Sequence, residues 1–203
     1  MLNIPYWIDL AGIFFFAMSG AQAAADKRVY RDWFGIGFMG FVTAIGGGSL
    51  RDIMLGIHPL KWIADSNYLI VIGAGVIISM VLGRTLAKLS RTMLIFDSLG
   101  IGLYTILGVQ ISLAVGVNPI AAVIMGMFSA VFGGVIRDTL LNEIPLIFRK
   151  EIYATACLAG AALYVVMEHF QVNIHISAFA GILTVISIRM LAVHYEWSLP
   201  KMG

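Results

Sequence analysis

Two glycine-rich stretches inside apolar sequence, each followed by an arginine and an aspartate, constrain this chain more than any other feature. The first is GGGSLRD at residues 46–52, and the second is FGGVIRD at residues 132–138. Glycine costs about 1 kcal/mol relative to alanine in a helix interior. An unpaired charge at the centre of a bilayer costs about 3 kcal/mol or more. Because so unfavourable a feature recurs at matching places, we infer that it has a function.

The composition is that of an integral membrane protein. Of the 203 residues, 60% are hydrophobic and 12% are charged, whereas soluble domains carry about 25% charged residues. About 20 apolar residues cross a bilayer as a helix, and strand-like alternation is absent. Seven spans are predicted, at residues 6–25, 33–57, 67–86, 92–115, 119–141, 152–169 and 174–190. They leave almost nothing for a soluble domain, so we expect one all-α transmembrane domain over residues 1–203.

The distribution of basic residues predicts the orientation of the chain, because cytoplasmic loops are enriched in Lys and Arg. Lys61 alone lies in loops on one side. The other side carries Lys27, Arg28, Arg31, Arg84, Lys88, Arg91, Arg149, Lys150, Arg189 and Lys201. We therefore expect the N-terminus outside and the C-terminus in the cytoplasm, which requires an odd number of spans and agrees with seven.

The internal repeat is wider than the glycine stretches. Asp9 in the first span matches Asp97 in the fourth, and Pro59-Leu60 matches Pro145-Leu146. We assign the first repeat to residues 5–88, the second to residues 92–170, and an extra helix to residues 174–193. Each repeat has three spans, so the second copy enters the membrane from the opposite face. Such inverted repeats are typical of transporters and channels.

We expect the second and fifth helices to be broken at their glycines. Carbonyl groups freed at such breaks attract cations near the bilayer centre. The candidate pathway residues are Thr43, Gly46, Gly47, Gly48, Ser49, Arg51, Asp52, Ser129, Gly133, Gly134, Arg137 and Asp138. We expect one member of each Arg-Asp pair to line a water-filled vestibule and the other to be held by protein. The alternative is that the glycines serve only close helix packing and that each Arg-Asp pair is a structural salt bridge.

Other polar residues give weaker signals. Asp9 and Asp97 are interpreted either as caps of helix starts or as part of the ion path. Cys157, the only cysteine, is expected to be a small buried hydrophobic residue. The four histidines are scattered at span ends, so we predict no metal site, and no cofactor is expected.

With these motifs the chain resembles the trimeric intracellular cation channel (TRIC) family, in particular its prokaryotic members, long catalogued as glycine transporters or as an uncharacterised membrane family. The resemblance covers nearly the whole chain. It implies a homotrimer with one pore in each protomer, conducting monovalent cations, chiefly potassium and also sodium. It also implies a place in the prokaryotic plasma (inner) membrane, allows bound lipid, and suggests no nucleic-acid partner.

Three function classes compete at this point. A passive cation channel and a secondary transporter of a small solute such as glycine both suit inverted repeats with broken helices. A membrane enzyme would need a nucleophile, a metal cluster or an acid–base pair, and we find no His-Glu-x-x-His or Gly-x-Ser-x-Gly motif in the sequence. We therefore expect that the protein is not an enzyme.

Overall fold

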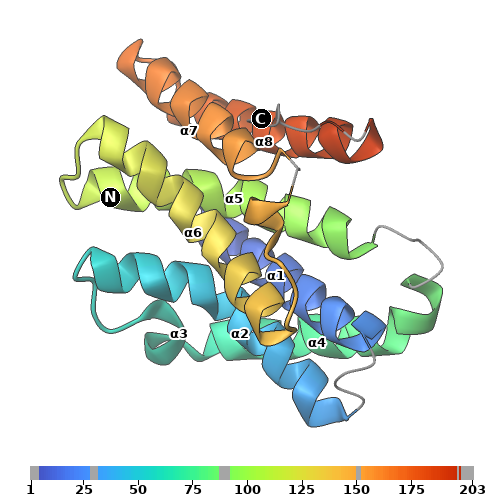
Figure 1. Cartoon of the computed structure of the whole chain (residues 1–203). Coiled ribbons are helices and arrows are strands. Elements are labelled where there is room, and N and C mark those ends of the chain that lie inside the picture. Colours follow the sequence, from blue (N-terminus) through green and yellow to red (C-terminus); the bar gives the residue numbers. More distant parts are fainter. Residues whose placement is uncertain (1–4, 28–31, 87–91, 150–151, 196, 198–203) are drawn as a thin grey trace.

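The computed structural model describes residues 5–27, 32–86, 92–149, 152–195 and 197, and its regular elements within these ranges are all helical. Figure 1 shows how they pack. The elements are α1 (Tyr6–Lys27), α2 (Trp33–Met54), α3 (Lys61–Ala64), α4 (Ser66–Leu86), α5 (Thr92–Ala114), α6 (Pro119–Leu140), η1 (Leu146–Phe148), α7 (Ala154–His169) and α8 (Ile174–His194).

Local sequence explains where several helices begin. The Asp32 side chain accepts a hydrogen bond from the backbone N–H of Gly35 at 2.8 Å, which caps α2. Asn118 caps α6 in the same way, through the backbone N–H of Ala121 at 3.0 Å, and Pro119 occupies the first turn. Both caps satisfy amide groups that the first turn of a helix leaves without partners.

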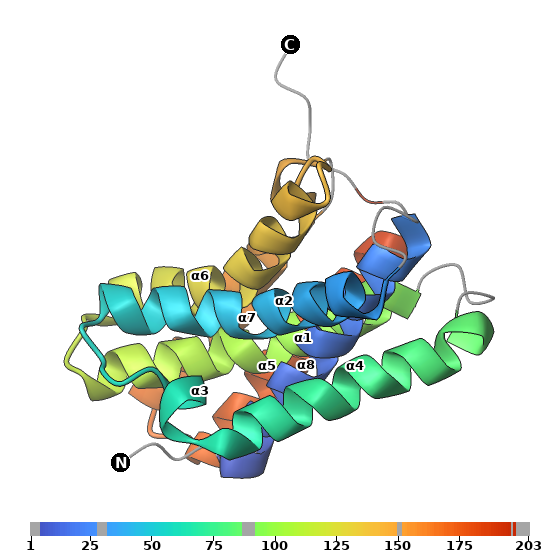
Figure 2. The same cartoon turned by 90° about the horizontal axis from the view of Figure 1, so that it is seen from below.

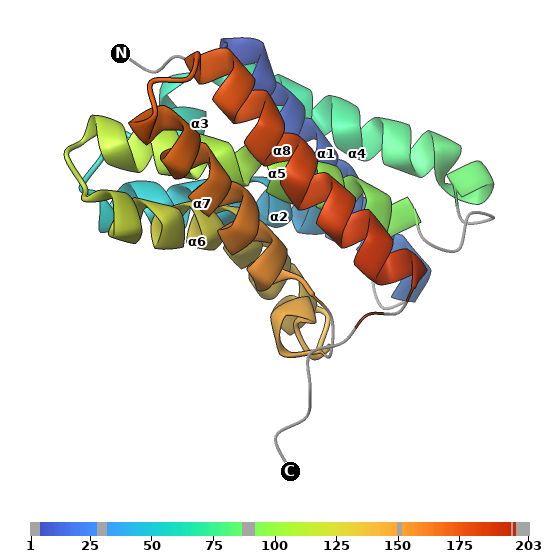
Figure 3. The same cartoon turned by 90° about the horizontal axis from the view of Figure 1, so that it is seen from above.

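Helices α1 and α5 form the centre of the bundle. The apolar stretches of these two helices are 67% and 72% buried, against 33–44% for α2, α6 and α8. α1 packs against α2 and α4, while α5 packs against α6, α7 and α8. Figure 2 shows α4 along one side of α1, and Figure 3 shows α7 and α8 side by side over α5. The two halves of the chain meet where α1 packs against α5 and where α2 packs against α6.

The long helices agree well with the predicted spans. The described part of the chain has seven helices of 16 to 23 residues, and each overlaps one predicted span. Five of them are long and apolar enough to cross a membrane, and the apolar parts of α4 and α7 are shorter. α2 ends at Met54 rather than residue 57, and α8 continues to His194 rather than residue 190. Exposed aromatic residues such as Trp33 (83%) and Phe34 (80%) suit a surface in contact with lipid.

The expected helix breaks are not observed. α2 is one continuous α-helix through Gly46, Gly47 and Gly48, and α6 is continuous through Gly133 and Gly134. The glycines instead let α2 and α6 cross at very short distance. A Cβ atom on Gly47 would lie 2.1 Å from the Ser129 carbonyl oxygen. One on Gly133 would lie 2.5 Å from the Thr43 carbonyl oxygen. The alternative interpretation, close helix packing, is the one that agrees with this geometry.

The two halves pack their first two helices alike. In the first half, a Cβ atom on Gly40 of α2 would lie 2.9 Å from the Ala17 carbonyl oxygen of α1. In the second half, a Cβ atom on Gly126 of α6 would lie 2.6 Å from the Thr105 carbonyl oxygen of α5. Gly40 and Gly126 both precede the glycine stretch of their helix. Each half therefore uses the same small residue for the same close approach.

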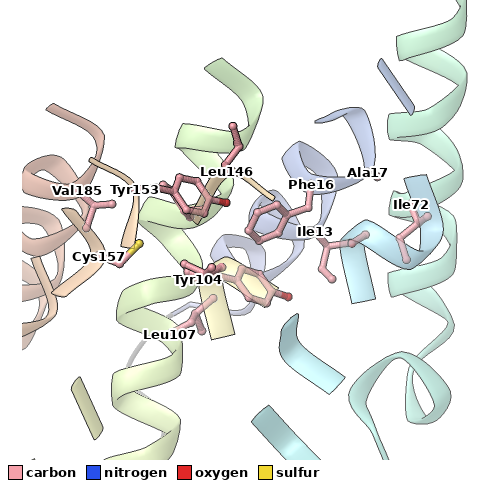
Figure 4. Packing of buried hydrophobic residues seen from close by; sticks show 14 of the residues in the cluster. Ile13, Phe16, Ala17, Ile72, Tyr104, Leu107, Leu146, Tyr153, Cys157 and Val185 are labelled. Carbon is pink, nitrogen blue, oxygen red and sulfur yellow. The ribbon is translucent and has the colours of Figure 1, made fainter. Parts of the chain in front are cut away.

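Aromatic rings fill the centre between α1 and α5. Phe16 and Tyr104 meet edge to face, with ring centroids 5.3 Å apart, and both are at most 3% exposed. Gly12 leaves room for the Tyr104 ring, and Gly100 leaves room for the Phe16 ring. Figure 4 shows these rings with Leu146, Tyr153 and Cys157 in one packed cluster. Cys157 is fully buried, as expected for a packing residue.

Candidate functional site

Each glycine stretch is followed by an arginine that pairs with its own neighbouring aspartate. In the last turn of α2, Arg51 Nε donates to Asp52 Oδ1 at 2.8 Å, and Nη2 lies 2.7 Å from the same oxygen. Arg51 Nη1 reaches across the helix crossing to Ser129 Oγ at 3.0 Å. Arg51 and Asp52 are at most 3% exposed. Both charges are therefore withdrawn from solvent and held by each other.

A second carboxylate and a lysine lie beside this pair. Asp9, in the first turn of α1, accepts hydrogen bonds from the hydroxyls of Tyr68 and Tyr104, both at 2.8 Å. Lys61 of α3 lies with Nζ 2.5 Å from Asp9 Oδ2. The Asp9 side chain is 7% exposed and the Lys61 side chain 29%. We call Asp9, Arg51, Asp52 and Lys61 the first charged centre.

The second glycine stretch builds a deeper centre. Arg137 Nε donates to Asp138 Oδ1 at 2.8 Å, while Nη1 donates to Asp97 Oδ1 and to Ser19 Oγ, both at 2.7 Å. Asp138 Oδ2 accepts the backbone N–H of Leu146 at 3.0 Å. The side chains of Arg137 and Asp97 are 0% exposed, and that of Asp138 is 6% exposed. We call Arg137, Asp138 and Asp97 the second charged centre.

An arginine on α8 lies close to the second charged centre. The Arg189 guanidinium carbon is 4.9 Å from the centre of the Tyr153 ring, and Nη1 donates to the Ile152 carbonyl at 3.4 Å. Arg189 is 0% exposed, whereas the sequence had placed it among the basic residues of a cytoplasmic end. It balances the two carboxylates together with Arg137, as Lys61 does with Arg51 in the first centre. Charge balance matters because a buried, unpaired charge is very unfavourable.

Free space adjoins the first charged centre. A cavity of about 20 Å³ is lined by residues that include Gly48, Ser49, Arg51 and Asp52, which is room for about one water molecule. A larger pocket of about 370 Å³ is lined by residues that include Asp9, Lys61 and Asp65. Lys61 borders both spaces. An ion entering the larger pocket would therefore meet Asp9 and Lys61 before it reached Arg51 and Asp52.

The predicted pathway residues fall into two groups. Thr43 and Ser129 lie at the helix crossing, where Thr43 Oγ1 donates to its own helix at the Met39 carbonyl. Ser49 accepts the indole N–H of Trp62 at 3.1 Å. The two Arg-Asp pairs lie beyond the crossing and pair internally, so neither pair has one member in an open vestibule: all four residues are buried.

The sequence interpretation underrated several residues of the two centres. Asp9 and Asp97 were interpreted as helix caps or as part of the ion path, and the structure adds that their carboxylates bind side chains from other elements. The repeat had already matched these two residues, each followed three residues later by glycine, but it did not show which side chains they contact. Tyr68, Tyr104 and Ser19 gave no sequence signal for their contacts. Among the described residues, no three His, Cys, Asp or Glu side chains are grouped for metal binding.

Comparison of sequences shows similarity along almost the entire chain. A family model described as "Glycine transporter" matches residues 6–84 and 94–169. The UPF0126 inner membrane protein YadS of Escherichia coli K12 is 36% identical over 199 residues, which cover 97% of this chain and 95% of YadS. A UPF0126 membrane protein of Deinococcus radiodurans is 40% identical over 168 residues, covering 81% and 77% of the two chains.

Comparison of structures shows the same fold in solved proteins. A TRIC trimeric intracellular cation channel orthologue from Rhodobacter sphaeroides superposes with a TM-score of 0.87 at 32% identity, covering 94% of this chain and 97% of that one. A prokaryotic TRIC channel solved in 0.5 M KCl gives a TM-score of 0.86 at 31% identity, covering 95% and 97%. Both similarities extend over all three helices of each half and over α8.

Proposed function

Because this chain belongs to the TRIC cation channel family, among the bacterial UPF0126 inner membrane proteins, we propose that it conducts monovalent cations, chiefly potassium and also sodium. The observation that carries this proposal is the similarity, over nearly the full length, to prokaryotic TRIC channels at TM-scores of 0.86–0.87. These similar structures are channels and not enzymes. The description "Glycine transporter" is the name of a family model, and solute transport is therefore an outcome for the experiment to exclude.

The proposed assembly is a homotrimer in the bacterial inner membrane, with a pore inside each protomer. The support for a trimer is that the Rhodobacter sphaeroides orthologue is a trimeric channel. All seven long helices would cross the membrane, with the N-terminus outside and the C-terminus in the cytoplasm. Most of the basic residues that predict this orientation lie outside the described residues, namely Arg28, Arg31, Lys88, Arg91, Lys150 and Lys201.

We further propose that the two halves form an inverted repeat. Gly40 and Gly126 make matching close approaches to the preceding helix of their half, and Gly47 and Gly133 contact each other's helices reciprocally. Both Arg-Asp pairs close on themselves with the same Nε–Oδ1 distance of 2.8 Å. Such matched contacts are what a pseudo-two-fold axis between α2 and α6 would produce. α8 stands outside this symmetry as a packing helix.

The proposed ion path follows the two charged centres and the crossing between them. A cation would enter at Asp9 and Asp52, pass the hydroxyls of Thr43 and Ser129, and leave at Asp138. The short contacts at the crossing leave no space for an ion in the arrangement described. Conduction would therefore require α2 and α6 to separate, and this structure would represent the closed channel.

Purified protein in planar lipid bilayers tests the function directly. With a gradient of potassium chloride across the bilayer, the equilibrium potentials of potassium and chloride have opposite signs. Unitary currents that reverse near the potassium equilibrium potential are expected. Saturable uptake of labelled glycine without unitary currents would instead establish a transporter and refute the channel. Sodium substitution on one side then measures the ratio of sodium to potassium permeability.

Neutralising variants test the path. Asp52→Asn and Asp138→Asn should each lower unitary potassium conductance and cation selectivity, because each removes a negative charge beside the route. Glu143→Gln is the matched control, since Glu143 pairs with Arg149 on the exposed surface at 3.1 Å, outside both centres. Equal conductance and selectivity in all three variants would show that the ions take another route.

A further inference from the structure

Three buried polar atoms in and beside the second charged centre have no hydrogen-bond partner among the described residues. They are Asp97 Oδ2, Arg137 Nη2 and the Tyr153 hydroxyl. The three residues come from α5, α6 and the segment just before α7, and each is at most 1% exposed. A buried polar atom left without a partner is strongly unfavourable, and in folded proteins such atoms are usually satisfied by ordered water. We therefore looked for a single ligand that could satisfy all three atoms.

All three groups adjoin Gly134. A Cβ atom built on Gly134 would lie 2.9 Å from the Tyr153 hydroxyl and 3.5 Å from Arg137 Nη2. It would also lie 3.6 Å from Asp97 Oδ1, the other oxygen of the same carboxylate. Only the lack of a side chain at Gly134 keeps this space free. The Tyr153 hydroxyl, Arg137 Nη2 and the Asp97 carboxylate thus all face the side of Gly134 where a side chain would stand.

The chemistry of these atoms restricts what can occupy that space. Arg137 Nη2 only donates hydrogen bonds, so its partner must accept. Asp97 Oδ2 only accepts, so its partner must donate. A potassium ion cannot accept a hydrogen bond from Arg137, and an anion without a proton, such as chloride, cannot donate one to Asp97. A water molecule does both, and with Tyr153 it would make three hydrogen bonds, the usual number for buried water.

We propose that one structural water molecule, and no permeant ion, binds beside Gly134 and joins Asp97, Arg137 and Tyr153. It ties the segment before α7 to α5 and α6, in addition to the bond from Leu146 N–H to Asp138. The inference does not depend on whether the protein conducts ions.

The first half lacks this site, which supplies a matched control. Gly48 is the counterpart of Gly134, and a Cβ atom there would lie 3.3 Å from a ring carbon of Tyr104 and 3.7 Å from Arg51 Nη2. Yet Arg51 Nη2 is 2.7 Å from Asp52 Oδ1, and the Tyr104 hydroxyl donates to Asp9. No orphaned donor faces Gly48, so the first centre does not require the same water.

The experiment is a structure of the wild-type protein at a resolution that shows ordered water, from crystals soaked in thallium(I), a heavy substitute for potassium. We expect a density peak within hydrogen-bond distance of Asp97 Oδ2, Arg137 Nη2 and Tyr153 Oη, without anomalous scattering. No peak at that position would overturn the proposal. A peak with the anomalous signal of thallium would also overturn it, and would make the site a cation site.

Variants give a second, independent readout. Gly134→Ala should lose the peak and should lower the melting temperature in detergent, because the methyl group takes the place of the water. Gly48→Ala should retain the peak at the second centre. Retention of the peak in Gly134→Ala would contradict the assigned position. Should Gly134→Ala not fold, the wild-type density still decides.

Discussion

The close crossing of α2 and α6 makes Gly47→Ala an informative perturbation. In the wild-type structure, the position of the new methyl carbon would be 2.1 Å from the Ser129 carbonyl oxygen. An ordinary contact needs about 3.4 Å, so α2 and α6 would have to move apart by about 1.3 Å (3.4 − 2.1). The obstacle is a backbone atom within a helix, which cannot rotate away as a side chain can.

The structure sets the size of the effect. Overpacking of this kind costs about 1–3 kcal/mol, and a backbone obstacle places the cost at about 3 kcal/mol. Alanine recovers about 1 kcal/mol through its higher helix propensity, so the net loss should be about 2 kcal/mol. The separation would also stretch the hydrogen bond from Arg51 Nη1 to Ser129 Oγ beyond its present 3.0 Å.

The control is Gly73→Ala in α4, where a Cβ atom would meet nothing within 4 Å. It should be stabilising by about 1 kcal/mol, because only helix propensity changes. The two variants should therefore differ by about 3 kcal/mol. For a chain of this size, that corresponds to roughly 6–12 °C in melting temperature, taking 2–4 °C per kcal/mol.

Thermal unfolding in a mild detergent, followed by tryptophan fluorescence, measures the difference. Gly133→Ala, whose Cβ would lie 2.5 Å from the Thr43 carbonyl oxygen, should behave like Gly47→Ala. If Gly47→Ala and Gly73→Ala melt within 2 °C of each other, the rigid crossing described here is wrong. An adaptable break at the glycines, as first expected from the sequence, would then be the better explanation.

Two further predictions concern the buried charges and the cysteine. Asp97→Asn should cost about 3 kcal/mol, because it leaves fully buried Arg137 with one carboxylate. Asp9→Asn should cost no more than about 1 kcal/mol, since Lys61 is partly exposed and can turn to water. If denaturant unfolding showed that the two variants lose the same free energy of unfolding, the deeper burial of the Asp97–Arg137 pair would not explain the stability of the protein. Cys157 is fully buried, so a membrane-impermeant maleimide should label it only after unfolding, and mass spectrometry that found fast labelling of the native protein would refute this packing.

The sequence alone determined the class of the protein and the approximate course of its chain. Hydropathy decides this, because a long apolar run has to satisfy its backbone polar groups within itself and so becomes a helix. Each predicted span overlaps a long helix of the structure, and five of these helices are long and apolar enough to cross a membrane. These are local properties, set by neighbours along the chain.

The tertiary structure decided how the glycines and charges are used. From the sequence, Gly47 is compatible both with a helix break and with a close helix crossing. Which of the two occurs depends on whether another helix, here α6, lies against it. The partners of Asp9 and Arg189 come from elements distant in sequence, Lys61 of α3 and Tyr153 before α7. Which faces of two helices meet depends on the packing of the whole bundle. Hydropathy along a single chain contains no information about that choice.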